Sequence, residues 1–217
     1  MAPWSGRRLL VWRHGQTPHN AAGIWQGQLD SPLSEVGKEQ ARVAAGRLAA
    51  YRPSVIVSSD LARASDTARA LAGLVGLPIR YDERLREIHV GRWQGRTGSD
   101  TRAEYPEQHA ALDRGEDIPR GVDGETMAQV EARARAAVDQ ILVDLPEDAS
   151  AVVATHGVCG RAAVASLVGL DQGSAWDTLV GLGNCRWAEV REYAHGWRIW
   201  GWNLGVEPMW PSNTGDG

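Results

Sequence analysis

Short apolar segments that alternate with segments of helical period dominate this sequence of 217 residues. Apolar runs at 9–12, 54–58 and 149–155 are each followed directly by polar or charged residues. Strands that alternate with helices are joined by right-handed crossovers, so that neighbouring strands run parallel. The pattern therefore predicts an α/β fold, a three-layer α/β/α sandwich around a mostly parallel central sheet.

Four segments of helical period follow these runs, and three of them start at residues able to cap a helix. The expected helices are 35–50 after Ser34, 61–75 after Ser59 or Asp60, 127–145 after the capping box of Thr126 and Gln129, and 157–168. The first helix has small residues on its inner face, which predicts close packing on the sheet. The inner face consists of Gly37, Ala41, Ala44, Ala45 and Leu48, of which all but Leu48 are small.

Residues 185–193 and 196–203 alternate in hydropathy around a short turn, which predicts an antiparallel hairpin at one edge of the sheet. A further short strand is expected at 78–81. The hairpin carries several tryptophans, which either form a homodimer surface or pack under the adjacent helices. They are Trp187, Trp197, Trp200 and Trp202.

The chain shows no internal repeat and no linker, so residues 1–217 are expected to form one domain. The polar, glycine-rich stretch 91–124 is expected to be an irregular or partly helical lid over the sheet. Residues 204–217 are rich in Pro, Gly and Asn, and are expected to form a loose tail.

Charge and cysteine content exclude several classes of function. The net charge of −4 and the isoelectric point of about 5.9 offer no basic face to nucleic acid. Cys159 and Cys185 have no partner at metal-ligand spacing. The apolar run before Arg13 is too short for a signal peptide or a membrane span. We expect a cytoplasmic protein that binds neither membranes nor nucleic acid.

Unusual polar residues follow three of the expected strands. Arg13 and His14 follow the first, Asp60 and Arg63 the second, and His156 a later one. Ligands of open α/β sheets bind beyond the carboxyl ends of the strands, where these side chains would meet. The sequence therefore predicts a site with two histidines and two arginines at one edge of the sheet.

Such a site suits phosphoryl transfer. A neutral imidazole such as that of His14 is a good nucleophile near pH 7, and guanidinium groups match the geometry of phosphate oxygens. His156, if protonated, would add another donor. Arginines can then replace the metal ion that stabilises phosphate oxygens elsewhere. Glu87 is the best-placed carboxyl group to protonate the leaving oxygen.

Simpler interpretations remain open for each residue alone. Arg63 could pair with Asp60, and Glu87 could be a solvated surface charge. His14 and His156 with Asp60 or Glu87 could bind zinc, although two neighbouring arginines would repel the cation. A non-catalytic phosphate-binding module is a further alternative, but it would need neither a nucleophile nor an acid.

The motifs around these residues resemble the histidine phosphatase superfamily, which includes phosphoglycerate mutase. The resemblance rests on Leu10-Val-Trp-Arg-His-Gly-Gln-Thr17, Gln26-Gly-Gln-Leu-Asp-Ser-Pro-Leu-Ser34, Ser58-Ser-Asp-Leu-Ala-Arg-Ala64, Leu85-Arg-Glu87 with Trp93-Gln-Gly95, and Thr155-His-Gly157. It implies a phosphohistidine on His14, a proton donor in Glu87, and neither metal nor cofactor. It also implies that the phosphoryl group is held by Arg13, Asn20, Gln26, Arg63, His156 and the Gly157 amide.

The resemblance leaves two activities for comparison, phosphatase and cofactor-dependent mutase. Ile24 replaces an arginine common in the family, and Val90 stands where mutases tend to carry tyrosine. Residues 96–125 hold eight carboxylates against four arginines, which is unfavourable for a bisphosphate. The chain is more similar to the actinobacterial glucosyl-3-phosphoglycerate phosphatases. We expect a phosphatase for a small phosphorylated metabolite with a neutral or hydroxyl-rich remainder, either a sugar phosphate or a phosphomonoester like glucosyl-3-phosphoglycerate.

Overall fold

The structure, a computed structural model, describes residues 6–206, and its centre is one six-stranded sheet in the order β3-β2-β4-β1-β5-β6. The strands are β1 (Arg8–Arg13), β2 (Val55–Ser58), β3 (Ile79–Tyr81), β4 (Ser150–Thr155), β5 (Trp187–Tyr193) and β6 (Gly196–Leu204). Neighbours among the first four are parallel, whereas β5 pairs antiparallel with β1 and β6 antiparallel with β5. The expected sheet is confirmed, with the reversed strand one place in from the edge. Of the expected tail, residues 207–217 lie outside the described part.

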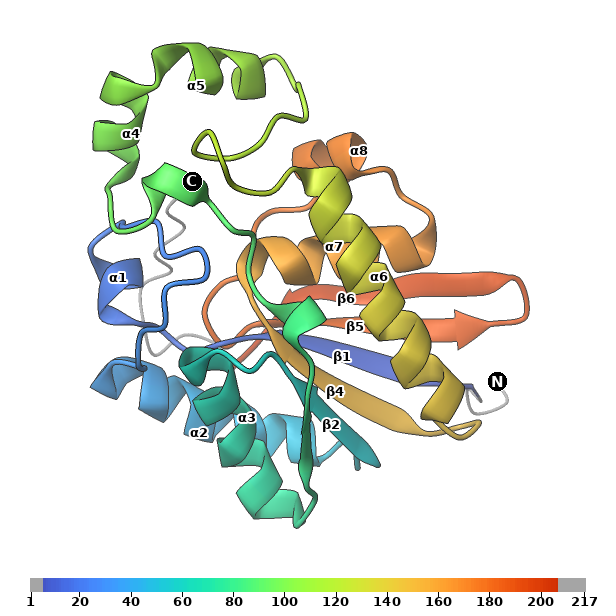
Figure 1. Cartoon of the computed structure of the whole chain (residues 1–217). Coiled ribbons are helices and arrows are strands. Elements are labelled where there is room, and N and C mark those ends of the chain that lie inside the picture. The colour runs from blue at the N-terminus through green and yellow to red at the C-terminus, as the bar shows by residue number, and fades with distance from the viewer. Residues whose placement is uncertain (1–5, 207–217) are drawn as a thin grey trace.

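Helices cover both faces of this sheet (Figure 1). They are α1 (Pro18–Ala21), α2 (Glu35–Ala49), α3 (Ala62–Val75), α4 (Gly98–Glu104), α5 (Pro106–Asp113), α6 (Met127–Asp144), α7 (Gly157–Val168) and α8 (Gln172–Thr178). Two short 3-10 turns, Glu83–Leu85 and Gly91–Trp93, precede α4. Helices α2 and α3 pack on one face and α6 and α7 on the other. The described residues contain no helix long and apolar enough to cross a membrane.

Side chains of the central strands alternate between two cores. Leu9 and Val11 pack in the core under α6 and α7, whereas Leu10 and Trp12 pack in the core with α2 and α3. All four are essentially inaccessible to solvent. Parallel strands covered on both faces have continuous apolar runs, which is why the strand pattern is clear in the sequence.

Residues expected to cap a helix N-terminus do so in two of three helices, α2 and α6. Ser34 accepts a hydrogen bond from the Gly37 N–H at 3.0 Å, and Thr126 forms its capping box with Gln129. The expected cap of α3 is wrong. Leu61 is its N-cap residue and gives no side-chain cap bond.

The two residues expected to cap α3 are engaged elsewhere. Asp60 binds Arg86, and the Ser59 hydroxyl lies 2.9 Å from the His156 ring. Asp30, from a distant loop, accepts a bond from the Ala62 N–H instead, at 2.8 Å. The N-terminus of α3 is therefore satisfied by tertiary contact, which local sequence does not reveal.

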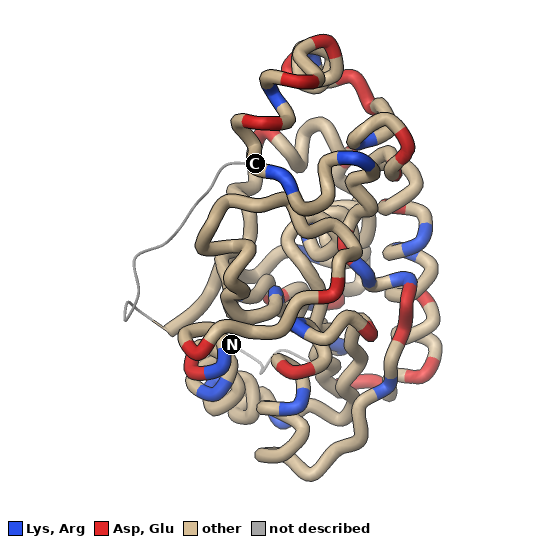
Figure 2. The backbone as a smooth tube through the Cα atoms, turned by 60° about the vertical axis from the view of Figure 1, so that its left-hand side comes forward, with Lys and Arg blue, Asp and Glu red and all other residues tan. Residues whose placement is uncertain are grey.

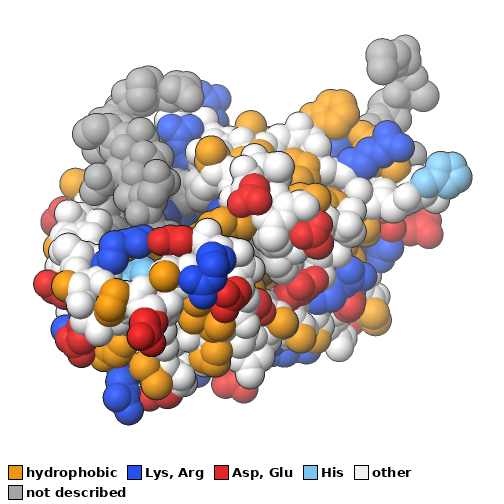
Figure 3. All heavy atoms as spheres, turned by 90° about the horizontal axis from the view of Figure 1, so that it is seen from above, with side chains coloured by type: hydrophobic (Ala, Val, Ile, Leu, Met, Phe, Trp, Pro, Cys, Tyr) orange, Lys and Arg blue, Asp and Glu red, His pale blue; other side chains and the backbone are white. Residues whose placement is uncertain are grey.

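The lid stretch 91–124 contains two short helices, α4 and α5, which lie beyond the sheet (Figure 1). Acidic and basic residues both occur along it (Figure 2), and Figure 3 shows acidic and basic side chains interspersed over the face seen from above. The ion pairs within the lid are Arg96–Glu104, Arg102–Asp113, Arg114–Glu116 and Arg120–Asp117. The four arginines counted between 96 and 125 are thus all paired with lid carboxylates.

The hairpin tryptophans have different surroundings. Trp187 is buried, and Trp197 and Trp202 pack partly buried against the core of α6 and α7. Trp200 is 59% exposed and lies over the Arg191 guanidinium at 4.0 Å. Three of the four therefore serve packing within the chain.

A close approach of two glycines fixes α2 against the loop after β1. A Cβ atom on Gly15 would lie 2.4 Å from the Gly37 carbonyl oxygen, and one on Gly37 would lie 2.0 Å from the Gln16 carbonyl oxygen. Ser34 adds hydrogen bonds to the same loop through the Gln16 carbonyl. The backbones touch here, so no side chain fits at either glycine.

We expect Gly37→Ala to lower the free energy of unfolding by about 1–3 kcal/mol, because overpacking must push α2 away from the loop. Gly46 lies in the same helix, and a Cβ atom added there would have no heavy atom within 4 Å. Gly46→Ala should therefore raise stability by up to about 1 kcal/mol through helix propensity. Urea unfolding of both variants measures the two changes in the free energy of unfolding. Equal changes would contradict the close contact between Gly37 and the loop after β1.

Candidate active site

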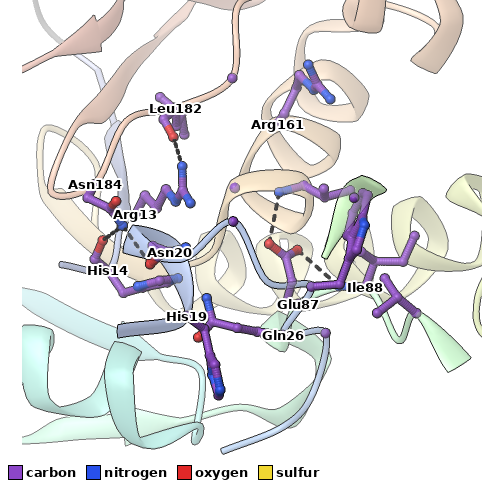
Figure 4. A pocket seen from close by; sticks show the side chains of 18 of the residues that line it. Arg13, His14, His19, Asn20, Gln26, Glu87, Ile88, Arg161, Leu182 and Asn184 are labelled. Atoms are coloured by element: carbon purple, nitrogen blue, oxygen red, sulfur yellow. Dashed lines mark hydrogen bonds between the residues drawn. The ribbon is translucent and has the colours of Figure 1, made fainter. Parts of the chain in front are cut away.

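Three parallel strands end at the same level and bring the predicted residues together. Arg13 at the end of β1 is in register with Thr155 of β4, and Ser58 of β2 with Ala154. Beyond these ends lies a cavity of about 580 Å³, shown in Figure 4. Its lining includes Arg13, His14, Asn20, Gln26, Arg63, Glu87 and Gly157. The predicted residues thus meet in one pocket, with His156 directly behind His14.

The His14 ring is held in one orientation by the backbone. Its Nδ1 atom lies 2.7 Å from the Gly15 carbonyl oxygen, to which it must donate a proton. The lone pair then resides on Nε2. Burial, together with the nearby charges of Arg63 and Arg13, lowers the pKa of His14 well below its ordinary value. His14 is therefore a neutral imidazole at pH 7 with a defined nucleophilic nitrogen.

His156 is fully buried and meets the His14 ring edge-on, with ring centroids 5.1 Å apart. The Ser59 hydroxyl, which accepts a hydrogen bond from the Leu61 N–H, lies 2.9 Å from His156 Nε2 and can donate its proton to that nitrogen. The proton of the neutral ring is then on Nδ1. Burial and the neighbouring Arg63 charge lower the pKa of His156 well below its ordinary value, so the free site holds it neutral rather than protonated.

The two arginines are anchored by main-chain carbonyls rather than by carboxylates. Arg63 donates to Leu29 O at 2.8 Å and Gly27 O at 2.7 Å, and Arg13 donates to Leu182 O. The alternative pairing of Arg63 with Asp60 is wrong, because Asp60 binds Arg86. Desolvation lowers the pKa of Arg63 to about 10 and also lowers that of Arg13, yet both stay charged at pH 7.

Three buried donors around His14 have no acceptor among the described residues. They are Arg13 Nε, Arg63 Nε and His156 Nδ1. Buried polar groups are almost always hydrogen-bonded, and an unpaired one costs about 1–3 kcal/mol. Donors gathered in this way are complementary to an oxyanion with several acceptor oxygens.

The amides of Asn20 and Gln26 are tethered through their oxygens. Asn20 Oδ1 accepts from the Thr17 N–H at 3.1 Å and from Asn184 at 3.2 Å. Gln26 Oε1 accepts from the hydroxyls of Thr17 at 2.9 Å and Ser31 at 2.6 Å. Each NH₂ group is therefore left to donate into the pocket.

Glu87 lies against the first turn of α7. Its Oε1 accepts from the N–H groups of Ile88 and Cys159, each at 3.0 Å, and its Oε2 from that of Val158 at 3.2 Å (Figure 4). Gly157, the first residue of α7, lines the pocket beside Arg13. The helix N-terminus thus holds the carboxyl group at the pocket wall and adds its partial positive charge to the site.

Arg133 on α6 fixes the segment that carries Glu87. Its guanidinium donates to the carbonyl oxygens of Arg84, Arg86 and Glu87, at 2.6–3.0 Å. The same group forms an ion pair with Glu125, which accepts a bond from the His89 N–H. Sequence reasoning missed this arginine, because its partners are main-chain atoms of a segment about 47 residues away.

Other pocket residues were also missed. Arg161, Trp176 and Asn184 line the pocket without having been expected there. Arg161 is the one charged residue in the α7 sequence Gly157–Val168, which is a signal that the sequence does contain. Helix α8, which carries Trp176, is too short to show a helical period.

The zinc alternative receives no support from the side-chain arrangement. Asp60 is bound to Arg86, and Glu87 is bound to backbone N–H groups. Residues 6–206 contain no group of three or more His, Cys, Asp or Glu side chains able to hold a metal ion. Both cysteines are free and buried.

Comparison with known proteins agrees with this geometry. Residues 9–205 match the family model of the histidine phosphatase superfamily (branch 1). The chain belongs to this superfamily. The match covers every element from β1 to β6 that positions the pocket.

Individual members of the superfamily are similar over nearly the whole chain. Glucosyl-3-phosphoglycerate phosphatase of Mycobacterium tuberculosis is 40% identical, covering 93% of this chain and 96% of its own. A probable phosphoglycerate mutase of Yersinia enterocolitica is 33% identical, covering 90% and 89%. The structure of a mycobacterial glucosyl-3-phosphoglycerate phosphatase with VO₃ superposes with a TM-score of 0.85 at 40% identity, covering 92% of this chain and 100% of that one.

The two buried histidines should make stability depend on pH. Below pH 6.5 the unfolded chain binds protons that folded His14 and His156 do not bind, because the folded pKa values are depressed. The free energy of unfolding should therefore fall with falling pH, by up to about 1.4 kcal/mol per pH unit for each histidine.

Urea unfolding between pH 7.5 and 5 measures this effect. The double variant His14→Gln/His156→Gln is the matched control, because it removes both titrating rings and keeps polar side chains of similar size. Its stability should depend less steeply on pH than that of the wild type. Equal slopes would show that the two rings protonate normally in the folded protein.

Proposed function

We propose that this protein is a phosphatase that hydrolyses a small phosphomonoester through a phosphohistidine on His14. The observation that carries the proposal is the set of three unpaired buried donors around the His14 ring, on Arg13, Arg63 and His156. A phosphoryl group offers oxygens for all three. The carboxyl group of Glu87 lies on the same pocket, as proton transfer to a leaving oxygen requires.

The first step transfers the phosphoryl group to the imidazole. The lone pair on His14 Nε2 attacks phosphorus, the bond from phosphorus to the ester oxygen breaks, and protonated Glu87 gives its proton to that oxygen. The ring becomes positively charged, and the bond from Nδ1–H to the Gly15 carbonyl stabilises it. Arg13 and Arg63 neutralise the charge on the equatorial oxygens.

The second step returns the enzyme to its starting state. A water molecule attacks phosphorus, gives a proton to the Glu87 carboxylate, and displaces His14 as the bond between Nε2 and phosphorus breaks. Inorganic phosphate leaves, and His14 is again neutral. The NH₂ groups of Asn20 and Gln26 and the N–H of Gly157 assist in holding the oxygens during both steps.

The lid favours a phosphatase over a mutase. A bisphosphate needs cations near its second phosphate, yet the four arginines between 96 and 125 are paired with lid carboxylates. Gly98 is the one residue of the lid stretch 91–124, all of which the structure describes, that lines the pocket. Ile24 and Val90 present apolar side chains there. Water is therefore the acceptor we assign.

The similar proteins reduce the range of phosphomonoesters to be considered as the substrate. The similarity to glucosyl-3-phosphoglycerate phosphatases supports an ester of this kind, a phosphorylated metabolite with a hydroxyl-rich part. Sugar phosphates and glucosyl-3-phosphoglycerate are therefore the first compounds to test.

Cellular location, metal requirement and oligomeric state also belong to the proposal. We take it to act in the cytoplasm without a metal ion and without nucleic acid, as one domain in which residues 91–124 cover the site. A homodimer through the β6 edge is supported by the exposed Trp200 on that outermost strand. Sedimentation of the full chain distinguishes monomer from dimer.

His14→Ala should reduce hydrolysis of p-nitrophenyl phosphate at least about 10³-fold, because it removes the nucleophile. His195→Ala is the matched control, since that side chain is exposed at the turn of the β5–β6 hairpin. EDTA should leave the wild-type rate intact. Wild-type enzyme quenched with ³²P-labelled substrate should carry an acid-labile, base-stable label, and a label-free protein would contradict the intermediate.

Incubation with 3-phosphoglycerate and 2,3-bisphosphoglycerate separates phosphatase from mutase. We expect release of inorganic phosphate with little exchange between the 2- and 3-phosphoglycerate isomers, because no lid arginine lines the pocket to hold a second phosphate. Nuclear magnetic resonance of phosphorus follows both reactions in one sample. Isomer exchange faster than phosphate release would overturn the assignment.

A further inference from the structure

The pocket extends beyond the residues that would hold a phosphoryl group. Its far wall is formed by α7, α8 and the segment after α8, and includes Arg161, Trp176 and residues 177–182. In the mechanism above none of these side chains acts on the reacting phosphorus. This wall is therefore available to the organic part of the substrate.

Arg161 is a buried cation in this wall without a carboxylate partner. Its residue surface is 7% exposed, and no carboxylate among the described residues forms an ion pair with it. A hydrogen bond from Nη1 to the Leu179 carbonyl oxygen, at 3.2 Å, uses one of its five N–H groups. Burial lowers the pKa of Arg161 to about 10, so it remains charged at pH 7.

The guanidinium of Arg161 is held flat. It stacks on the Trp176 indole at 3.7 Å from the ring centroid, and the carbonyl of Leu179 fixes one corner. Helix α7, whose first turn holds Glu87 through its N–H groups, sets the position of the side chain (Figure 4). A planar guanidinium with N–H groups available on one edge is preorganised for a fork of two oxygens.

The charges of the wall decide which anion fits. Two guanidinium groups, those of Arg13 and Arg63, are present where the phosphoryl dianion would bind, whereas the far wall has only that of Arg161. Asp177 also lines this wall and would repel a doubly charged group. A carboxylate carries one charge and two coplanar oxygens, and it matches a single arginine fork in both respects.

We propose that Arg161 is the residue that binds the carboxylate of the substrate's organic part, a group that glucosyl-3-phosphoglycerate carries. The proposal rests on the phosphatase function proposed above and adds Arg161 as the residue that recognises the substrate carboxylate. The carboxylates of the acidic lid do not bear on this carboxylate-binding subsite. Arg161 lies on α7 and outside that lid.

Matched pairs of substrates test the subsite on the whole protein. One pair is 3-phosphoglycerate and glycerol 1-phosphate, and a longer pair is 4-carboxyphenyl phosphate and 4-carbamoylphenyl phosphate. We expect the wild type to show a higher kcat/KM for the carboxylate in at least one pair, by about 10- to 100-fold. No preference in either pair would overturn the proposal without any variant.

Two variants then assign the preference to Arg161. Arg161→Met should abolish most of this preference, chiefly by raising KM for the carboxylate ester, and Arg161→Lys should keep part of it. Arg42→Met, at an exposed ion pair on α2, is the control and should keep all of it. A preference that survives in Arg161→Met, or a loss equal for both members of a pair, would refute the subsite.

Failure of the subsite and failure of the proposed function give different results. If wild-type enzyme does not hydrolyse p-nitrophenyl phosphate, the phosphatase function itself is wrong. If it hydrolyses p-nitrophenyl phosphate and both members of a pair equally well, the function stands and the carboxylate subsite is wrong.

Discussion

The burial of Arg13 and Arg63 beside two neutral imidazoles is the constraint on which the rest of the structure depends. Removing guanidinium groups from water is costly, and here main-chain carbonyls rather than carboxylates offset that cost. A carboxylate would have neutralised the site and blocked an anion. Carbonyl oxygens hold the arginines in position and leave their positive charge available. Burial, together with this charge, lowers the pKa of both histidines and keeps them unprotonated.

The strands and the main helices could be predicted because their signals are local. The apolar run at 9–12 is covered on both faces, and the small residues of α2 face the sheet as expected. The carboxyl ends of parallel strands also converge by rule, so His14, Arg63 and His156 could be expected in one place. The family motifs identified Glu87, Asn20 and Gln26, and the structure brings these side chains to the same pocket.

What could not be predicted depends on contacts between distant segments. Asp30 accepts a hydrogen bond from a free N–H group at the start of α3. Arg133 holds the segment before Glu87 through main-chain carbonyl oxygens, which every residue type has and which no sequence pattern can therefore reveal. Arg161 was overlooked although a lone charge in an apolar helix is unusual. Its environment depends on α8, a helix of seven residues without a recognisable period. The protonation state of His156 likewise follows from burial, which is a tertiary property.

The lid has a consequence for how such enzymes diversify. The four arginines of the segment from 96 to 120 each pair with a carboxylate of the same segment, so none of them forms an ion pair with the body of the protein. The main chain at Arg96 and the carboxylate of Asp117 bind the body of the protein, through the N–H groups of Trp25, Met127 and Ala128. Exchange of α4 and α5, which lie between these two points, would remove no hydrogen bond from His14 or from the carbonyl anchors of Arg13 and Arg63. Helix α2 has no such freedom, because Gly15 and Gly37 bring its backbone into direct contact with the loop that carries His14. The fold thus separates α4 and α5, which are open to exchange, from the loop of His14, where close backbone contacts leave no room for an added side chain.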